Sequence, residues 1–388
     1  MTNVIKEIVT LEDIYEAYYV CRKNKRSKPS AIKFELHYEK YLRQSYNDLN
    51  NGTYTISKSI VFGISRPKKR EVFAADFRDR IVHHLLMLRL EPILETEMID
   101  TSYNCRVNKG TTYGINTLYE QIKTVSNNYT KQTFVLQCDI QGFFMSINKE
   151  ILWKHVHNIM VKQWTLGNLE WWLDLTKQII MHRPELFCDI HGDKSILDNL
   201  PDEKTLFRSN GKGLPIGNLT SQIFGNYYLT PFDNWIKEEI GENMEYGRYV
   251  DDFYIVGCDK KRMLRLLPKF REQLKTNFDL TLHPRKVSIT DVKKGISFIG
   301  CVIKPWGIYN GNRTITNAFN FLKRYKKGDS IEDLIQTINS YFGFMVGRLS
   351  YGIRWNYWKA ICQKTNKLVC INMKKVSLKN HNHMNIIH

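Results

Sequence analysis

Hydrophobic and polar positions alternate along the chain in two different rhythms, which together predict a mixture of helices and strands. Apolar residues recur with helical spacing over 113–125 and over the Trp-rich stretch 150–182. The acidic residues Asp76 and Asp79 favour the start of another helix. Two helices separated by a basic break are expected within 10–50. Further helices are expected at 260–277, 314–327, 330–349 and 354–372. Strands are expected at 54–62, 133–139, 248–257, 280–289 and 295–303.

One irregular stretch interrupts these elements in the middle of the chain. Residues 185–212 contain Gly, Asp, Asn and Pro throughout and are expected to form a loop or a small insertion. The stretch leads into a glycine-rich turn over 211–217, after which a helix is expected to continue to about Ile240. Glycines in such a turn allow the backbone to approach a ligand closely.

Candidate chemistry centres on the segment Arg248-Tyr-Val-Asp-Asp-Phe-Tyr-Ile-Val-Gly257, in which a tight acidic turn joins two apolar strands. Adjacent carboxylates repel each other, so a fold that keeps Asp251 and Asp252 together usually provides a cation. An acidic surface turn is the alternative interpretation of the dipeptide alone. Asp139 ends another apolar strand, where a sheet can build an active site, and it provides a third carboxylate.

The charge balance points to a polyanionic partner. The 388 residues include 57 Lys and Arg against 39 Asp and Glu, a formal net charge of +18, and neutralising phosphates with such a surface releases counterions. Residues 304–388 hold 14 basic and 3 acidic residues, so +11 of this charge lies in the C-terminal part. The scattered cysteines, the absence of a signal-peptide pattern and the lack of a long apolar run predict a cytoplasmic protein without a membrane partner.

The order of these segments is more specific than any one of them. A basic hairpin at 66–73, Asp139, the turn before Gly217, the Asp-Asp hairpin, Lys286 and Phe298-Ile-Gly300 follow one another as in the reverse transcriptases, which this sequence resembles. The resemblance implies an α+β right-hand polymerase fold with an antiparallel palm sheet and a helical thumb. It also implies five segments: an N-terminal extension and fingers (1–130), palm (131–158), fingers and palm helices with the insertion (159–213), palm (214–305), and a basic helical thumb and tail (306–388).

The resemblance implies an RNA-directed DNA polymerase that uses an RNA template, a DNA or RNA primer and dNTPs. Two Mg²⁺ ions, for which Mn²⁺ can substitute, would be held by Asp139, the Ile140 carbonyl, Asp251 and Asp252, and Lys286 would protonate the leaving pyrophosphate. Arg70, with Lys68 or Lys69 as second choice, would grip the triphosphate, and Phe144 would exclude a 2′-hydroxyl. Gly217 and Ile216 would lie beside the base pair. Template and primer contacts are expected from Arg106, Gln222, Phe298 and Gly300.

A finer resemblance concerns Leu214-Pro-Ile-Gly-Asn-Leu-Thr-Ser-Gln222, which is similar to the form found in diversity-generating retroelements. Ile216 replaces the glutamine that most reverse transcriptases carry there, so low fidelity opposite template adenine is expected. Such an enzyme would copy a dedicated RNA and work with a small basic accessory protein. The alternatives are a reverse transcriptase of an anti-phage defence system copying a noncoding RNA, and a catalytically inactive nucleic-acid-binding scaffold.

Overall fold

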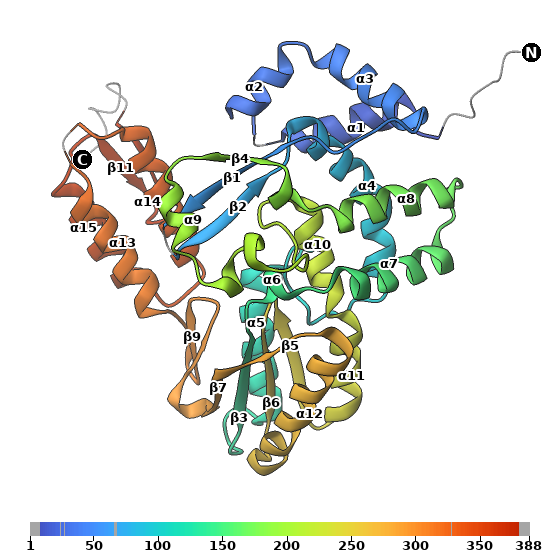
Figure 1. The fold of residues 1–388 in the computed structure, drawn as a ribbon. Helices are drawn as coiled ribbons and strands as arrows, with labels where there is room; N and C mark the ends of the chain where they lie inside the picture. Colours follow the sequence, from blue (N-terminus) through green and yellow to red (C-terminus); the bar gives the residue numbers. More distant parts are fainter. Residues whose placement is uncertain (1–7, 24, 27, 66–67, 327, 380–388) are drawn as a thin grey trace, which may run out of the picture.

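The N-terminal helices form a layer of their own at the top of Figure 1. The structure, a computed structural model, describes residues 8–23, 25–26, 28–65, 68–326 and 328–379. Three helices pack near α4 (Phe77–Glu95): α1 (Leu11–Arg22), α2 (Pro29–Glu35) and α3 (Tyr38–Asn50). The sequence pattern predicted two helices over 10–50. The extra helix, α2, has only seven residues, which is too short for helical periodicity to separate it from the break before it.

A three-stranded sheet forms the fingers. Its order is β2-β1-β4, with bounds β1 (Ser59–Ile64), β2 (Arg70–Ala74) and β4 (Cys188–His191). Strand β4 runs parallel to β1. Of the two predictions for residues 185–212, a loop or a small insertion, the structure has the insertion, which supplies this strand and the short helix α9 (Lys194–Asp198). Short 3₁₀ turns occur at Pro184–Leu186, Asp202–Lys204, Leu206–Arg208 and Val292–Lys294.

A buried carboxylate fastens this insertion to the fingers. Glu71 of β2 is fully buried, and it accepts hydrogen bonds from Thr205 Oγ1 at 2.6 Å and from the Leu206 amide at 2.9 Å. Burial raises the pKa of Glu71, while these two hydrogen bonds oppose the rise. The insertion is therefore a structural part of the fingers, held by a residue 134 positions away from Thr205.

The palm is a four-stranded antiparallel sheet in the order β5-β6-β3-β7. Its strands are β3 (Phe134–Ile140), β5 (Glu245–Tyr249), β6 (Asp252–Gly257) and β7 (Leu282–Asp291). Helix α5 (Thr111–Val125) covers one face, and α11 (Thr230–Ile240) and α12 (Lys260–Phe278) cover the other (Figure 1). Phe253 and Ile255 belong to one apolar cluster and Tyr254 and Val256 to the other. Both faces are buried, which explains the continuous apolar run of β6.

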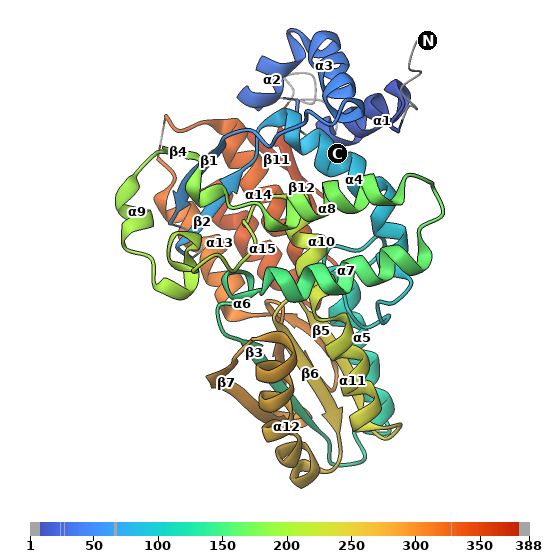
Figure 2. The same cartoon turned by 45° about the vertical axis from the view of Figure 1, so that its right-hand side comes forward.

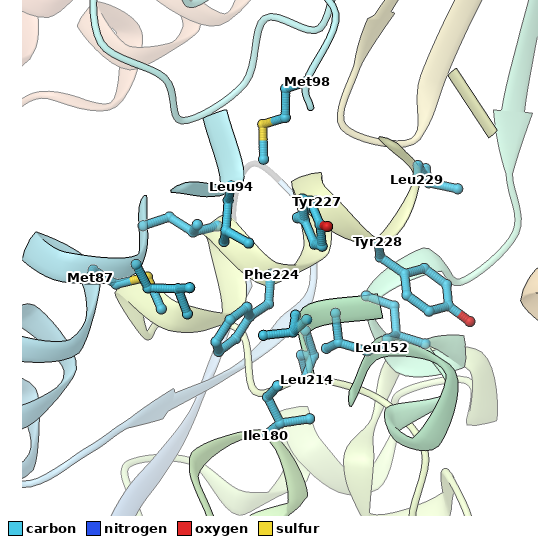
Figure 3. Packing of buried hydrophobic residues seen from close by; sticks show 14 of the residues in the cluster. Met87, Leu94, Met98, Leu152, Ile180, Leu214, Phe224, Tyr227, Tyr228 and Leu229 are labelled. Atoms are coloured by element: carbon cyan, nitrogen blue, oxygen red, sulfur yellow. The ribbon is translucent and has the colours of Figure 1, made fainter. Parts of the chain in front are cut away.

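Helix α10 (Leu219–Tyr228) lies at the junction of palm and fingers. Phe224, Tyr227 and Tyr228 of this helix are buried in a cluster with side chains of α4, α7 (Lys149–Gln163) and α8 (Leu169–Met181) (Figure 3). The single helix predicted from the glycine-rich turn to Ile240 is in fact two, α10 and α11. The second begins with Thr230-Pro231, and proline lacks the N–H that would continue the first helix.

The C-terminal part combines helices with two small sheets. A three-stranded sheet precedes the thumb helices: β8 (Ile296–Phe298), β9 (Cys301–Lys304) and β10 (Gly307–Asn310), followed by α13 (Asn312–Arg324), α14 (Ile331–Met345) and α15 (Tyr351–Cys362). Figure 1 shows these helices beside the fingers, and Figure 2 shows them behind the fingers. The helix predicted over 354–372 ends at Cys362, and the hairpin β11 (Leu368–Ile371) and β12 (Lys375–Leu378) follows. Residues 380–388 of the predicted tail lie outside the described residues.

These features confirm the predicted fold class, an α+β right-hand polymerase fold with an antiparallel palm sheet. The division into five segments at 130, 158, 213 and 305 stays a prediction. No helix in the described ranges is both long enough and apolar enough to cross a membrane.

Candidate active site

The Asp-Asp segment forms the tight hairpin that the sequence predicted. Tyr249 and Asp252 are paired across β5 and β6, which leaves Val250 and Asp251 as a two-residue turn. Val250 has a positive φ of 60°, a conformation that is rare for a β-branched residue because its side chain crowds the backbone. Such local strain persists only where surrounding contacts impose it.

The third carboxylate lies beside this turn. Asp139 of β3 is the register partner of Asp252, and the Ile140 amide donates a hydrogen bond to the Asp251 carbonyl at 3.1 Å. Lys286 of β7 contacts both carboxylate oxygens of Asp139, each at 2.9 Å from its Nζ. Three neighbouring strands thus bring together four residues that the sequence analysis assigned to catalysis.

The electrostatics of the three aspartates are those of crowded negative charges. Burial, then the charges of Asp251 and Asp139, raise the pKa of Asp252 to about 7. Burial and the charge of Asp139 likewise raise the pKa of Asp251. Asp252 nevertheless remains exposed to solvent at the mouth of the site, so water screens part of this repulsion. The three carboxylates therefore carry more negative charge than the Lys286 ammonium can neutralise.

Divalent cations fit this donor set chemically. Carboxylate oxygens are the ligands that Mg²⁺ prefers, and Asp251 and Asp252 gain when a cation neutralises their repulsion. Among the residues that the structure describes, no three His, Cys, Asp or Glu side chains already form a ready-made metal cluster. Asp139 instead pairs with the Lys286 ammonium, so binding of two ions by all three aspartates requires a rearrangement of these side chains.

The predicted triphosphate grip lies in the fingers hairpin, at and just before the start of β2. Lys68 and Arg70 are both exposed, with Arg70 at the start of β2. The charge of Lys68 lowers the pKa of Asp251, against the larger raising effects, which indicates that the fingers hairpin reaches the electrostatic range of the site. Arg66 and Pro67, predicted at the tip of this hairpin, lie outside the described residues.

A backbone strap connects the fingers to α10 beside the site. The Phe73 amide donates to the Ile216 carbonyl at 2.8 Å, and Gly217 follows with φ 123°. A Cβ on Gly217 would lie 2.4 Å from the Phe73 carbonyl oxygen, so glycine is required for this approach. The Ile216 side chain packs against an apolar cluster of the fingers. Phe144 in α6 (Phe143–Ser146) is half-buried and lies close to Gly225 of α10.

The structure does not support direct nucleic-acid contact by two predicted residues. The Arg106 side chain is 5% exposed, pairs with Glu95, and donates to the carbonyls of Ile99 and Ser102. The Phe298 ring is buried and packs edge-on against Tyr254. Both side chains are therefore used to hold the protein together, and the template and primer assignments of these two residues stay predictions.

The neighbours of these two residues remain accessible. Gln222 is exposed on α10, and Gly300, with φ 75°, is exposed in the turn after Phe298. A pocket of about 170 Å³ separates this turn from the carboxylates, and its lining includes Asp139, Asp252 and Lys286. Ser297, Phe298 and Ile299 line the same pocket from the side of the turn.

A buried polar network that the sequence did not predict lies beneath the Asp-Asp hairpin. Its centre is Arg248, whose side chain is fully buried and paired with the buried Asp233 of α11. Asn226, Ser102 and Tyr246 complete the network. The position of Arg248 directly before the hairpin was the available signal, but a sequence does not show that an arginine is buried.

An antiparallel palm sheet that carries three aspartates at one end, between fingers and a helical thumb, defines a nucleic-acid polymerase of the right-hand class. A family model described as reverse transcriptase (RNA-dependent DNA polymerase) matches residues 65–303. Because this match spans more than half of the chain, the protein belongs to the reverse transcriptase family.

Similar proteins include the protein YkfC of Escherichia coli K12, 24% identical over 267 residues, or 61% of this chain and 63% of that protein. The putative COX1/OXI3 intron 1 protein of Saccharomyces cerevisiae is 24% identical over 202 residues, or 52% of this chain and 21% of that protein. The chain thus spans less than two thirds of the length of these relatives. A Candida albicans telomerase structure aligns with 84% of this chain and 60% of its own, at 11% identity and a TM-score of 0.48. At this low identity and TM-score, the similarity to telomerase says nothing about the function of the chain.

Proposed function

We propose that the protein is an RNA-templated DNA polymerase that extends a primer with dNTPs. The observation that carries the proposal is the meeting of Asp139, Asp251 and Asp252 at one end of the palm sheet, beside Lys286. Family membership makes nucleotidyl transfer the first chemistry to consider for this cluster. Two bound Mg²⁺ ions would activate the primer 3′-hydroxyl and stabilise the charge on the triphosphate, with Mn²⁺ as a substitute.

The protein's own residues divide the remaining work. Lys68 and Arg70 are exposed cations that can bind the triphosphate in the space between fingers and palm. Lys286, half-exposed beside Asp139, can donate a proton to the departing pyrophosphate. The half-buried ring of Phe144 next to α10 is suited to limit the space available to a sugar 2′-hydroxyl.

The test is primer extension of oligo(dT) on poly(rA) with dTTP and Mg²⁺ or Mn²⁺. Asp251→Asn should lower the rate by about 10³-fold, equivalent to about 4 kcal/mol of lost transition-state stabilisation. Asp174→Asn, a change at an exposed aspartate of α8, should keep wild-type activity. A wild-type protein without extension contradicts the proposal and favours a nucleic-acid-binding scaffold. An Asp251→Asn variant with wild-type activity contradicts the catalytic role given to Asp251.

We further propose that the enzyme copies a dedicated RNA of a diversity-generating retroelement with low fidelity. The support is the segment from Leu214 to Gln222, in which Ile216 replaces a polar side chain and packs against apolar residues of the fingers. An isoleucine makes no side-chain hydrogen bond, so the strap beside Gly217 has less capacity to discriminate between base pairs. A small basic accessory protein belongs to this proposal as a partner.

Fidelity on an adenine-containing RNA template tests this role. Ile216→Gln should reduce misincorporation opposite adenine, whereas Ile216→Leu, which keeps the apolar character, should leave it high. Equal error rates in all three proteins would refute the argument from Ile216. A neighbouring variable gene with two repeats supports the retroelement role, and a defence gene cluster with a noncoding RNA supports the anti-phage role instead.

A further inference from the structure

The guanidinium of Arg248 reaches the backbone of the Asp-Asp turn. Its Nη1 donates to the Val250 carbonyl at 3.0 Å, and Val250 is the residue with a positive φ that immediately precedes Asp251. On the other side, the Ile140 amide donates to the Asp251 carbonyl. Both carbonyls of the two-residue turn are therefore held, one by a side chain and one by the neighbouring strand.

Arg248 is itself held by a nearly complete set of partners. Its Nε donates to Asp233 Oδ1 at 2.7 Å and its Nη2 to Asp233 Oδ2 at 2.5 Å. The same side chain donates to the Asn226 side-chain oxygen at 3.1 Å and to the Asn226 carbonyl at 3.0 Å. Ser102 Oγ accepts at 3.3 Å. A rigid fork with this many partners has one orientation, so the Val250 carbonyl has a fixed donor.

The network joins three elements that the active site needs. Asn226 lies on α10, the helix that begins after the Gly217 strap, and Asp233 lies on α11. Ser102 belongs to the loop before α5, and its backbone bridges to Arg248. Displacement of any of these elements would move the donor that holds Val250, and with it the carboxylate of Asp251.

From these contacts we propose that Arg248 is a positioning residue for metal binding, acting through the Val250 carbonyl on the carboxylate of Asp251. It works through the backbone geometry of the turn and not through its charge, because Asp233 already neutralises the guanidinium. The proposal rests on the proposed two-metal polymerase. It adds a specific cause for the strained turn and a determinant of metal affinity outside the three carboxylates.

Two variants separate positioning from stability. Arg248→Lys keeps a positive charge but has three donors on a single nitrogen, so it cannot reach both Asp233 and the Val250 carbonyl. Tyr246→Phe is the matched control, because the Tyr246 hydroxyl donates to Asp233 Oδ1 at 2.6 Å in the same buried network. Both variants lose buried hydrogen bonds, but only the first loses a bond to the turn.

The measurements are Mn²⁺ affinity by electron paramagnetic resonance, thermal midpoints with and without Mg²⁺, and primer-extension kinetics. Arg248→Lys should weaken Mn²⁺ binding roughly 10- to 100-fold and lower kcat by about 100-fold, with the KM for dNTP unchanged. Tyr246→Phe should lower the midpoint but leave the Mn²⁺ affinity at the wild-type value. Unchanged Mn²⁺ affinity in Arg248→Lys, or an equal loss in both variants, would overturn the proposal.

A third variant tests the proposal in case Arg248→Lys does not fold. Asn226→Ala removes the neutral acceptor that orients Nη1, and it should weaken Mn²⁺ binding less than Arg248→Lys does. Wild-type Mn²⁺ affinity in a folded Asn226→Ala protein would count against the proposal. The metal measurements require no turnover, so inactivity of the wild type would contradict the polymerase proposal without deciding the role of Arg248.

Discussion

Two β-branched residues with positive φ mark the turns around the candidate site. They are Val250, in the Asp-Asp turn, and Ile299, with φ 43° in the two-residue turn between β8 and β9. Within the part of the chain that the structure describes, the other non-glycine residues with positive φ are mainly asparagines, which tolerate this conformation. Strain of this kind concentrates at functional sites. Asp252, which follows the first turn, and Ile299 of the second turn line the same pocket.

The crowded aspartates predict an unusual pH dependence of stability in the absence of divalent ions. The pKa of Asp252 is about 7 in the folded protein against 3.8 for the ordinary residue, so the folded state binds the extra proton between these values. Stability from this group is therefore highest below about pH 4 and declines as pH rises through 7. We expect Asp252→Asn to gain stability relative to wild type on going from pH 5 to pH 8 in EDTA.

Thermal midpoints measured in parallel for both proteins check this expectation, with Asp174→Asn as a control for loss of an ordinary surface charge. Excess Mg²⁺ at pH 8 should raise the midpoint of wild type and reduce the difference between the two proteins, because a bound cation relieves the repulsion. A difference independent of pH would show that Asp252 titrates like a solvated aspartate.

At this scale the sequence was informative about chemistry but not about burial. Asp139, Asp251 and Lys286 were selected because their types suit metal and phosphate chemistry, and the structure places them together. Arg106 and Phe298 have equally suitable types, but their side chains turn inward. Whether an arginine or a phenylalanine faces a ligand depends on tertiary contacts that a local pattern does not contain.

At the scale of elements, the strap before α10 is the connection most sensitive to substitution. Gly217→Ala places a Cβ 2.4 Å from the Phe73 carbonyl oxygen in a backbone with φ 123°, so the strap must move away from β2. We expect a loss of about 1–3 kcal/mol of unfolding free energy and a higher KM for dNTP. Urea denaturation and steady-state extension measure the two effects.

Gly347→Ala is the matched control for that substitution. Gly347 also has a positive φ, 81°, but a Cβ there would meet nothing within 4 Å. It should therefore show the backbone penalty without the clash and without a change in the KM for dNTP. Similar KM values for both variants would mean that the contact between the strap and β2 does not position the nucleotide.

The elements that the sequence failed to predict are short: α2 has seven residues, and β4, β11 and β12 have four each. Strand β4 has only four residues and pairs with β1. Four residues are too few for an alternating pattern to identify a strand. The C-terminal hairpin β11–β12 likewise consists of two four-residue strands. The longer palm strands and the helices α5 and α12 contain enough residues for their hydrophobic periodicity to be recognised from sequence alone.

At the scale of the whole molecule, the distribution of charge predicts how the protein grips nucleic acid. Arg313 is exposed near the start of α13, and the preceding Gly311 amide donates to the Gly300 carbonyl. We expect Arg313→Gln to weaken primer–template binding and to reduce the slope of log affinity against log salt by about 1. Fluorescence anisotropy over a salt series measures both.

The control is Lys162→Gln, which removes an exposed cation from the end of α7, on the opposite side of the fingers from the thumb helices (Figure 1). This variant should change neither the affinity nor the slope. An unchanged slope in Arg313→Gln would place the nucleic-acid path elsewhere on the basic surface.

The pairing order of the palm sheet also bears on how the chain acquires its fold. Strand β3 lies in the centre of the sheet, yet its partners β6 and β7 come much later, and Asp139 is 147 residues from Lys286. Closing loops of this length precedes any gain from the contacts, so such topologies fold slowly. During synthesis, β7 must therefore leave the ribosome before the sheet can close. Until then, the apolar faces of β3 are exposed to chaperones and to other nascent chains.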